Sequence, residues 1–285
     1  MTANELLASF KALTPWTATR YTVDRIVRGN GEKEVKSALI SWMGSNKVLQ
    51  RAKELNVDLL LVHEPFVWTH FDESNPNIIG FQRATEAASK FRILDESGIV
   101  LMRIHDIWDT YPNEGVPWAL ANYLGFYQEV FPEAHTIKEM NEHPIWNNEP
   151  IGAEHYHHCY KINLTSVSLI AKQIAEKTFP LGQCGVQVVG NHGQLIQKIG
   201  IGAGCYCRPE IFQIMGCDAA IVCDDGAKYW SDLSWAIDNK YPLFRISHGV
   251  AEEPGIQNLY LYCKNHFLNI SFFFEPLDLQ WQQIF

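Results

Sequence analysis

A short apolar run that stops abruptly at polar residues constrains the fold of this chain more than any other feature. Residues 58–63 contain the apolar run that is typical of a fully buried strand. Pro65 ends it, because proline cannot donate to a sheet ladder. His63 and Glu64 lie between, at the carboxyl end of the strand, where open α/β sheets bind ligands. His and Glu also occur at strand ends merely because solvent begins there, and taken alone the stretch favours that plain explanation.

Predicted strands and helices alternate along most of the chain. In the first half, strands at 35–43, 58–63 and 98–104 are separated by helices at 45–55 and 81–95. This order is typical of a parallel sheet with right-handed crossovers. The second half repeats the alternation, with predicted strands at 185–189, 196–201, 218–223, 241–247 and 268–274 and predicted helices at 165–178, 209–215, 229–238 and 254–265.

We therefore expect an α/β fold made of two similar lobes, each with a sheet flanked by helices. The predicted N-terminal lobe covers residues 1–125 and the C-terminal lobe residues 161–285. Residues 126–160 show no clear period and are interpreted as a connector that contains a short hairpin or helix. Within it, the cluster from His155 to Cys159 suggests a metal site, but surface or aromatic-packed histidines explain it equally well.

Charge and composition narrow the classes of function. The net charge is −9, and the 23 Lys and Arg residues form no dense basic cluster, so we expect no nucleic-acid partner. The start of the chain lacks a basic segment followed by an apolar core, and no apolar run reaches the length of a membrane span. The seven cysteines are scattered and odd in number, which favours reduced thiols in a cytoplasmic protein.

Three predicted strand ends carry pairs of residues that can bind metal ions. The pairs are His63 with Glu64, His105 with Asp109, and His248 with Glu252. If a helix begins near His248, the last pair lies one turn apart on one helix face and can share one ion or two adjacent ions. A mixed set of imidazoles and carboxylates suits transition ions such as Zn, Mn, Fe, Ni or Co.

These residues belong to an ordered series of motifs. The series contains a buried strand that ends in His-Glu-Pro (63–65), His-x-x-x-Asp (105–109) before a glycine turn and a helix (115–125), Gly-Ala-Gly (202–204), Asp-Asp with Lys-Tyr (224–229), and Ser-His-Gly-Val-Ala-Glu-Glu-Pro-Gly (247–255). Together they resemble the NIF-three-like (interacting-factor-three-like) family over roughly residues 35–124 and 164–261. That family consists of hexameric dinuclear-metal proteins, often labelled GTP cyclohydrolase 1 type 2 homologues.

The resemblance implies two divalent metal ions in a cleft between the lobes, and a homo-hexamer. It assigns one ion to His63, Asp109 and Glu252, and the other to Glu64, His248 and Glu252, so that Glu252 bridges them. His105 would sit in the second shell, where it orients Asp109 or a water. Glu64 departs from the family, which has a second histidine there, and the change favours Mn or Fe over softer ions or weakens the second site.

The function implied by this set is a metal-dependent hydrolase that acts on a small molecule, either a nucleotide or another phosphoester. The alternative from another class is a non-catalytic metal-binding scaffold or a metallochaperone. A turnover screen on metal-loaded protein separates the two. A structural zinc site made by Cys205, Cys207, Cys217 and Cys223 is a further alternative, but their spacing lacks the paired knuckles of such sites.

Overall fold

A computed structural model describes residues 1–68, 81–146, 149, 151–202, 204–278, 281 and 284, with the side chains of 81–84 excepted. The chain divides into two compact units. Unit 1 comprises Met1–Tyr111 and Ile256–Leu277, and unit 2 comprises Pro112–Gly255 and Asp278–Phe285. The lobe boundaries at residues 125 and 160 stay a prediction.

The sheet of unit 1 has five strands in the order β1-β4-β3-β2-β11. Its four parallel strands are β2 (Ser37–Ser41), β3 (Leu59–Val62), β4 (Val100–Arg103) and β11 (Ser271–Phe274), and β1 (Arg25–Arg28) lies antiparallel beside β4. Every residue of β3 and β4 is buried. A continuous apolar strand of this kind is expected where both faces of a parallel sheet are covered.

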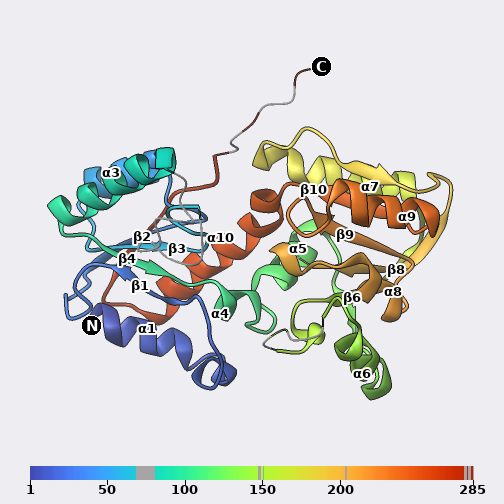
Figure 1. The fold of residues 1–285 in the computed structure, drawn as a ribbon, viewed down its shortest axis with the longest axis horizontal. Helices are drawn as coiled ribbons and strands as arrows, with labels where there is room; N and C mark the ends of the chain where they lie inside the picture. The colour runs from blue at the N-terminus through green and yellow to red at the C-terminus, as the bar shows by residue number, and fades with distance from the viewer. Residues whose placement is uncertain are drawn as a thin grey trace. The chain divides into compact units, whose positions relative to one another are not determined.

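Helices cover the sheet of unit 1, with α3 above it and α1 below it in the view of Figure 1. Thr2 and Glu5 form a capping box at the start of the first helix, and Ser45 caps the second. Leu49 and Leu94 pack with Leu60 of the sheet in one apolar cluster. The helical elements are α1 (Ala3–Lys11), the 3₁₀ turn η1 (Pro15–Ala18), α2 (Asn46–Glu54), α3 (Phe81–Ser97), α4 (Asp106–Asp109) and the later turns of α10 (His248–His266).

The sheet of unit 2 has six strands in the order β5-β6-β8-β9-β10-β7. The strands β8 (Leu195–Ile201), β9 (Ala219–Cys223) and β10 (Leu243–Ile246) are parallel to one another. Antiparallel pairing adds β6 (His158–Ser166) and β5 (Gln128–Val130) on one side and β7 (Gln187–Val189) on the other. The first residue of β6, His158, lies opposite Ile201, so it occupies the edge at which the parallel strands end.

The helices of unit 2 pack their apolar faces on this sheet. Residues from α5, α7, α8 and α9 join the strands in one buried cluster, in which Phe212 fills the space over Gly200. In Figure 1, α7 and α9 lie above the strands and α6 and α8 below them. The helical elements are α5 (Val116–Leu124), α6 (Ala134–Glu142), η2 (Ala153–His155), α7 (Val167–Thr178), η3 (Phe179–Leu181), η4 (Gly204–Tyr206), α8 (Pro209–Ile214), the π-helical turn η5 (Tyr229–Leu233), α9 (Ser234–Asp238) and the first turns of α10.

The predicted fold class, α/β with two sheets flanked by helices, is confirmed. Several elements differ from the prediction, α4 and β5 among them. The strands β1 and β6 were not predicted, and α10 begins at His248 rather than at Pro254. The helix start matters because it satisfies the condition under which His248 and Glu252 share a face. Within the described part of the chain, no helix combines the length and the apolar content needed to span a bilayer.

Candidate metal centre

Two neighbouring parallel strands place polar residues at one edge of the sheet of unit 1. Val62 and Arg103 are paired at the ends of β3 and β4, and His63 and His105 follow within two residues. The backbone N–H groups of His63 and Glu64 both donate to the carbonyl of Trp42, at 3.1 and 2.8 Å. This fixes the polypeptide just where the side chains leave the strand.

His63 is oriented as a metal ligand would be. The side chain is fully buried, and its Nδ1 lies 3.0 Å from the backbone carbonyl of Ile104. Only an Nδ1–H can donate to this carbonyl, so the neutral ring presents a lone pair on Nε2. Nε2 lies 3.4 Å from Oδ1 of Asp109. A backbone acceptor behind one ring nitrogen is the usual support of a histidine that binds metal through the other.

His105 connects three carboxylates. Its ring stacks on that of His63, with centroids 4.5 Å apart and planes 9° apart. Nδ1 lies 2.8 Å from Oδ1 of Asp106 and 3.2 Å from Oδ2 of Asp109, and Nε2 lies 3.6 Å from Oε1 of Glu64. Burial alone would lower the pKa of His105, but the nearby carboxylates, Asp109 foremost, outweigh it and raise this pKa well above its usual value. The cluster therefore attracts positive charge.

The spacing of the donor atoms fits a shared metal ion. His63, His105 and Asp109 each offer one ligand atom, and these atoms all lie within 4.8 Å of one another. Ligand atoms about 2.1 Å from a tetrahedral ion lie roughly 3.4 Å apart. The separations of 3.4 Å from His63 Nε2 to Oδ1 of Asp109 and of 3.2 Å from His105 Nδ1 to Oδ2 of Asp109 are close to that value, and they run to the two different oxygens of the carboxylate.

A buried aspartate that sequence analysis missed supports this cluster. Asp24 precedes β1, and its Oδ1 accepts the backbone N–H of His105 at 2.5 Å while its Oδ2 accepts that of Ile107 at 3.2 Å. Burial, reinforced by the charge of Asp106, raises the pKa of Asp24 to about 7. Asp106 in turn accepts the backbone N–H of Val23 at 3.1 Å. These bonds hold the turn between β4 and α4, and no motif around Asp24 signals them.

In unit 2, the predicted pair His248 and Glu252 meets within the first turn of α10. Nε2 of His248 lies 2.9 Å from Oε1 of Glu252, and Oδ1 of Asp224 accepts the backbone N–H of His248 at 2.7 Å. Gly204 lies beside this pair with φ of +66°. This backbone conformation favours glycine, and an added Cβ would lie 3.2 Å from Oε1 of Glu252 and press on that side chain.

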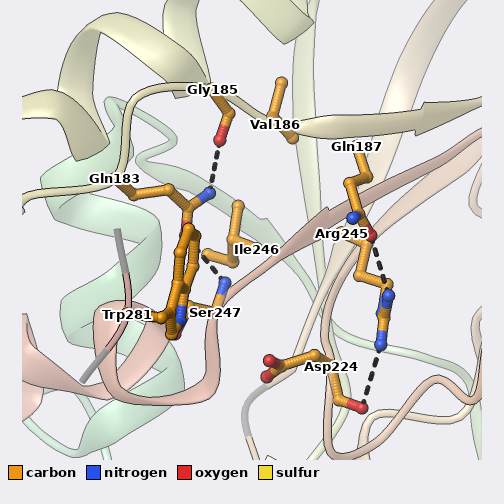
Figure 2. A pocket seen from close by; sticks show the side chains of 9 residues that line it. All are labelled: Gln183, Gly185, Val186, Gln187, Asp224, Arg245, Ile246, Ser247 and Trp281. Atoms are coloured by element: carbon orange, nitrogen blue, oxygen red, sulfur yellow. Dashed lines mark hydrogen bonds between the residues drawn. The ribbon is translucent and has the colours of Figure 1, made fainter. Parts of the chain in front are cut away.

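A cavity of about 270 Å³ lies at the ends of β9 and β10 in unit 2. Figure 2 shows that Gln183 closes one side, where its amide donates to the carbonyl of Gly185 and accepts the backbone N–H of Ser247. On the other side, Arg245 donates to Oε1 of Gln187 at 2.7 Å and to the carbonyl of Asp224 at 3.3 Å. Trp281 also lines the cavity. The lining combines polar and apolar side chains, and the cavity adjoins the start of α10.

The structure brings the predicted residues together in two groups. His63, Asp109 and His105 form a possible metal-binding triad in unit 1, with Glu64 beside His105. His248 and Glu252 form a pair in unit 2. The ligand assignment made from the family resemblance, in which His105 is only a second-shell residue, stays a prediction. Ala203 of the predicted glycine turn lies outside the described residues.

The two alternative metal sites receive no support from the described part of the chain. No group of three potential ligands there includes His155, His157 or His158, and none includes a cysteine. Cys207, Cys217 and Cys223 of the proposed zinc site are free thiols. Cys207 and Cys223 do approach each other, with sulfurs 3.8 Å apart, and both donate to the carbonyl of Gly204. They stabilise the turn next to Glu252 instead.

Comparisons with known proteins identify the relatives of this chain. The sequence profile of a family described as Duf34/NIF3 (NGG1p interacting factor 3) matches residues 1–278. No curated protein sequence gives a significant match.

Several solved structures share the fold. A hypothetical protein from Staphylococcus aureus superposes with a TM-score of 0.77 at 18% identity, covering 100% of this chain and 99% of that one. A Bacillus cereus protein related to NIF3 gives 0.73 at 14% identity, with 100% and 99% covered. Reduced HcgD from Methanocaldococcus jannaschii gives 0.67 at 18% identity, with 96% and 97% covered.

Proposed function

Because the chain belongs to the Duf34/NIF3 family, we propose that it is a divalent-metal protein that hydrolyses a phosphoester or a nucleotide. The observation that carries the proposal is the triad of His63, His105 and Asp109 with donor atoms at metal-ligand separations. A bound divalent ion would polarise a phosphoryl or ring carbon centre and lower the pKa of a water. The excess of carboxylates over imidazoles gives the cluster the charge that such an ion needs.

The residues around the triad hold it ready for an ion. The Ile104 carbonyl keeps the proton of His63 on Nδ1, and Asp24 fixes the backbone that carries His105. Preorganised ligands of this kind bind metal more tightly, because less freedom is lost when the ion enters. His63 is fully buried and Asp109 nearly so, which excludes most water from the ligand atoms.

Two ions, rather than one, remain part of the proposal. The resemblance assigns Glu252 to both ions and His248 to the second. Glu252→Ala should then remove two ions per chain, and Asp109→Ala one preferentially. Elemental analysis of the two variants gives the number of bound ions per chain. A Glu252→Ala variant that keeps two ions would show that Glu252 does not bridge them. We also propose the homo-hexamer and the GTP cyclohydrolase activity that the family resemblance implies.

The test of the function uses metal-loaded protein. Protein purified without chelator is analysed for bound metal and is then loaded with Mn, Fe or Zn. Each form is incubated with p-nitrophenyl phosphate and with nucleoside triphosphates, and the products are quantified. We expect turnover that disappears in Asp109→Ala. Full metal occupancy without turnover on any of these compounds would instead support a non-catalytic metal-binding protein.

A further inference from the structure

The cavity at the ends of β9 and β10 is a second place in the molecule where a ligand can bind. The residues that line it all belong to unit 2, and none of them is a member of the two groups of potential metal ligands. Two of the lining side chains, Gln187 and Asp224, are exposed, so the cavity can be reached from solvent. Its volume of about 270 Å³ is just below the roughly 300–1,000 Å³ of pockets for drug-sized ligands, which indicates a smaller ligand.

A half-buried arginine, Arg245, supplies the positive charge of this cavity. It lies on β10 opposite Gln187 of β7. Its Nη1 donates to Oε1 of Gln187 at 2.7 Å, and its Nη2 donates to the backbone carbonyl of Asp224 at 3.3 Å. Both acceptors are neutral, and within the described ranges no carboxylate forms an ion pair with this guanidinium. These residues therefore leave the charge of Arg245 without a counter-ion.

Arg28 of unit 1 shows how a carboxylate fills a guanidinium in the same chain. Its Nε and Nη2 donate to the two oxygens of Asp95 at 2.8 and 2.7 Å. In Arg245, by contrast, Nε is buried and has no hydrogen-bond partner among the described residues. Because a guanidinium has five N–H groups, one on each Nη nitrogen of Arg245 is still available to a ligand. Their planar arrangement matches the oxygens of a carboxylate or a phosphate, so the missing partner is an anion.

Asp224 limits the charge that this anion can carry. Its Oδ1 accepts the backbone N–H of His248 at 2.7 Å, and in Figure 2 its carboxylate points away from the guanidinium of Arg245. The carboxylate nevertheless lines the same cavity. It repels a dianion roughly twice as strongly as a monoanion at the same distance. The cavity therefore favours a carboxylate over a doubly charged phosphate.

The other side of the cavity is apolar and contains a flat ring. Val186, Ile246 and Trp281 contribute to the lining. Figure 2 shows Trp281 beside Gln183, on the opposite side from Arg245. The amide of Gln183 is held by the carbonyl of Gly185 at 2.6 Å and by a backbone N–H at 2.8 Å, so this side is fixed. An indole face favours stacking with a second aromatic ring.

We propose that the cavity of unit 2 binds a small aromatic monocarboxylate. The Nη groups of Arg245 donate to the carboxylate oxygens, the ring of the ligand lies on Trp281, and Asp224 discriminates against anions of higher charge. Binding involves no covalent step. The proposed site depends neither on the metal centre of unit 1 nor on the hydrolase function.

The first experiment titrates the full chain with small carboxylates. Isothermal titration measures the binding of benzoate and 3-phenylpropionate, with benzamide as the neutral control of nearly the same shape. Each titration is made with protein as purified and with protein stripped of metal by EDTA, because carboxylates also bind metal ions. We expect saturable binding of at least one of the two carboxylates in both forms, with Kd of roughly 1 mM or below, and no binding of benzamide.

The contact with Arg245 is tested by two replacements. Arg245→Gln removes the charge, so affinity for the aromatic carboxylate should fall by roughly 10- to 100-fold. Arg245→Lys keeps the charge without the planar donors, and its affinity should lie between. Arg92→Gln, which alters an exposed pair with Glu96 in unit 1, should bind like wild type. Melting temperatures show which variants are folded, and wild-type affinity in either folded Arg245 variant overturns the proposal.

The contact with Trp281 is tested through the shape of the ligand. Trp281→Leu keeps an apolar side chain but removes the flat ring. Its affinity for the aromatic carboxylate should fall by roughly 3- to 10-fold, and its affinity for cyclohexanecarboxylate should fall less. Trp230→Leu removes an exposed indole that does not line the cavity, so it should match wild type. Equal losses for the two ligands in Trp281→Leu overturn the assignment of an aromatic ligand.

The role of Asp224 is tested with phenyl phosphate, which is a dianion at about pH 8. Wild type should bind it more weakly than the aromatic carboxylate. In Asp224→Asn the amide oxygen can still accept the backbone N–H of His248, but the negative charge is gone. Affinity for phenyl phosphate should then rise by more than affinity for the carboxylate. No rise for phenyl phosphate overturns the discrimination assigned to Asp224.

Two outcomes of the titrations overturn the site as a whole. One is the absence of saturable binding of either aromatic carboxylate up to about 10 mM. The other is binding that disappears when the metal is stripped, because it would assign the carboxylate to a metal ion. Neither outcome bears on the hydrolase function, which turnover of metal-loaded protein tests separately.

Discussion

The two units place histidines and carboxylates at the ends of parallel strands, but they arrange them differently. In unit 1, His63 and His105 stack on each other and share Asp109, with Asp106 and Glu64 close by. In unit 2, the histidines are separated into pairs, with Glu129 for His158 and Glu252 for His248. The first arrangement gathers several carboxylates around two stacked rings, whereas in the second His158 faces Glu129 and His248 lies between Glu252, at 2.9 Å, and Asp225, at 3.8 Å.

This difference in the arrangement of carboxylates shows how the same residue types can take different chemical roles. Clustered carboxylates raise the pKa of His105, because a positive charge there relieves their repulsion. His157 is buried to a similar degree without such carboxylates in contact, and its pKa falls to about 3. Shared carboxylates thus create a site for a cation, whereas isolated contacts fix the position and the tautomer of a single ring.

The largest expected effect tests whether the cluster in unit 1 acts as one site. Asp109→Ala removes the carboxylate that both histidines face, so metal affinity should fall by more than the roughly 10- to 100-fold typical of supporting residues. Elemental analysis after dialysis gives the bound metal. Asp106→Asn is the matched control, because Asp106 lies 2.8 Å from His105 but is outside the triad, and it should keep its metal. Equal losses in both variants would show that the wrong carboxylate was chosen.

The next prediction concerns acid stability and His157, a buried histidine of unit 2. The folded pKa of His157, about 3, lies below its usual 6.5. The unfolded chain therefore binds the extra proton between these values, and stability falls as the pH drops from about 6.5 toward 3. At about 1.4 kcal/mol per pH unit, the loss is roughly 3 kcal/mol by pH 4.

Urea unfolding of wild type and His157→Phe between pH 6.5 and 4 checks the acid prediction. The variant should show a flatter dependence of the unfolding free energy on pH, since it has no group to titrate at this position. His135→Gln, at an exposed side chain, serves as the control and should follow wild type. Parallel curves for all three proteins would remove His157 from the explanation of acid sensitivity.

A smaller effect is expected at Asp24, which holds the backbone of the metal-binding cluster in unit 1. Asp24→Asn keeps the size of the side chain but can offer only one oxygen to the two backbone N–H groups of His105 and Ile107. We expect metal affinity to fall by roughly 10- to 100-fold. Isothermal titration with Zn measures it. Asp95→Asn, which alters an exposed pair with Arg28, should leave the affinity unchanged. An unaltered affinity in Asp24→Asn would make the aspartate a purely structural group.

The smallest effect is expected at Gly204, in the turn beside His248 and Glu252. Gly204→Ala puts a Cβ 3.2 Å from Oε1 of Glu252 at a residue with φ of +66°, so unfolding should require about 1–2 kcal/mol less free energy. Chemical denaturation compares it with Gly193→Ala, where an added Cβ has its nearest neighbour at 3.6 Å. A Gly204→Ala variant as stable as wild type would mean that the turn tolerates a side chain.

The sequence points to the candidate metal-binding residues because they follow directly after apolar strands. His63 and His105 come within two residues of β3 and β4, and the spacing of His248 and Glu252 indicates one helix face before the helix itself is seen. The residues that support these side chains could not be predicted in this way. Asp24 bonds to a residue 81 positions away, and Glu129 to one 29 positions away. Neither segment has a hydrophobic pattern from which the contact could be predicted. The strand β6 also lacks the continuous apolar run by which β3 is predicted.

The strand β11 has a consequence for how unit 1 forms. It pairs with β2, so the sheet joins Ser37–Ser41 to Ser271–Phe274, and some 230 residues separate the two. During synthesis, β2 leaves the ribosome long before its neighbour exists. At about 5–20 residues per second, its outer edge stays unpaired for roughly 10 to 50 seconds. Over that interval unit 2 can complete its own sheet, whereas unit 1 exposes a strand edge that chaperones, or another nascent copy, can bind.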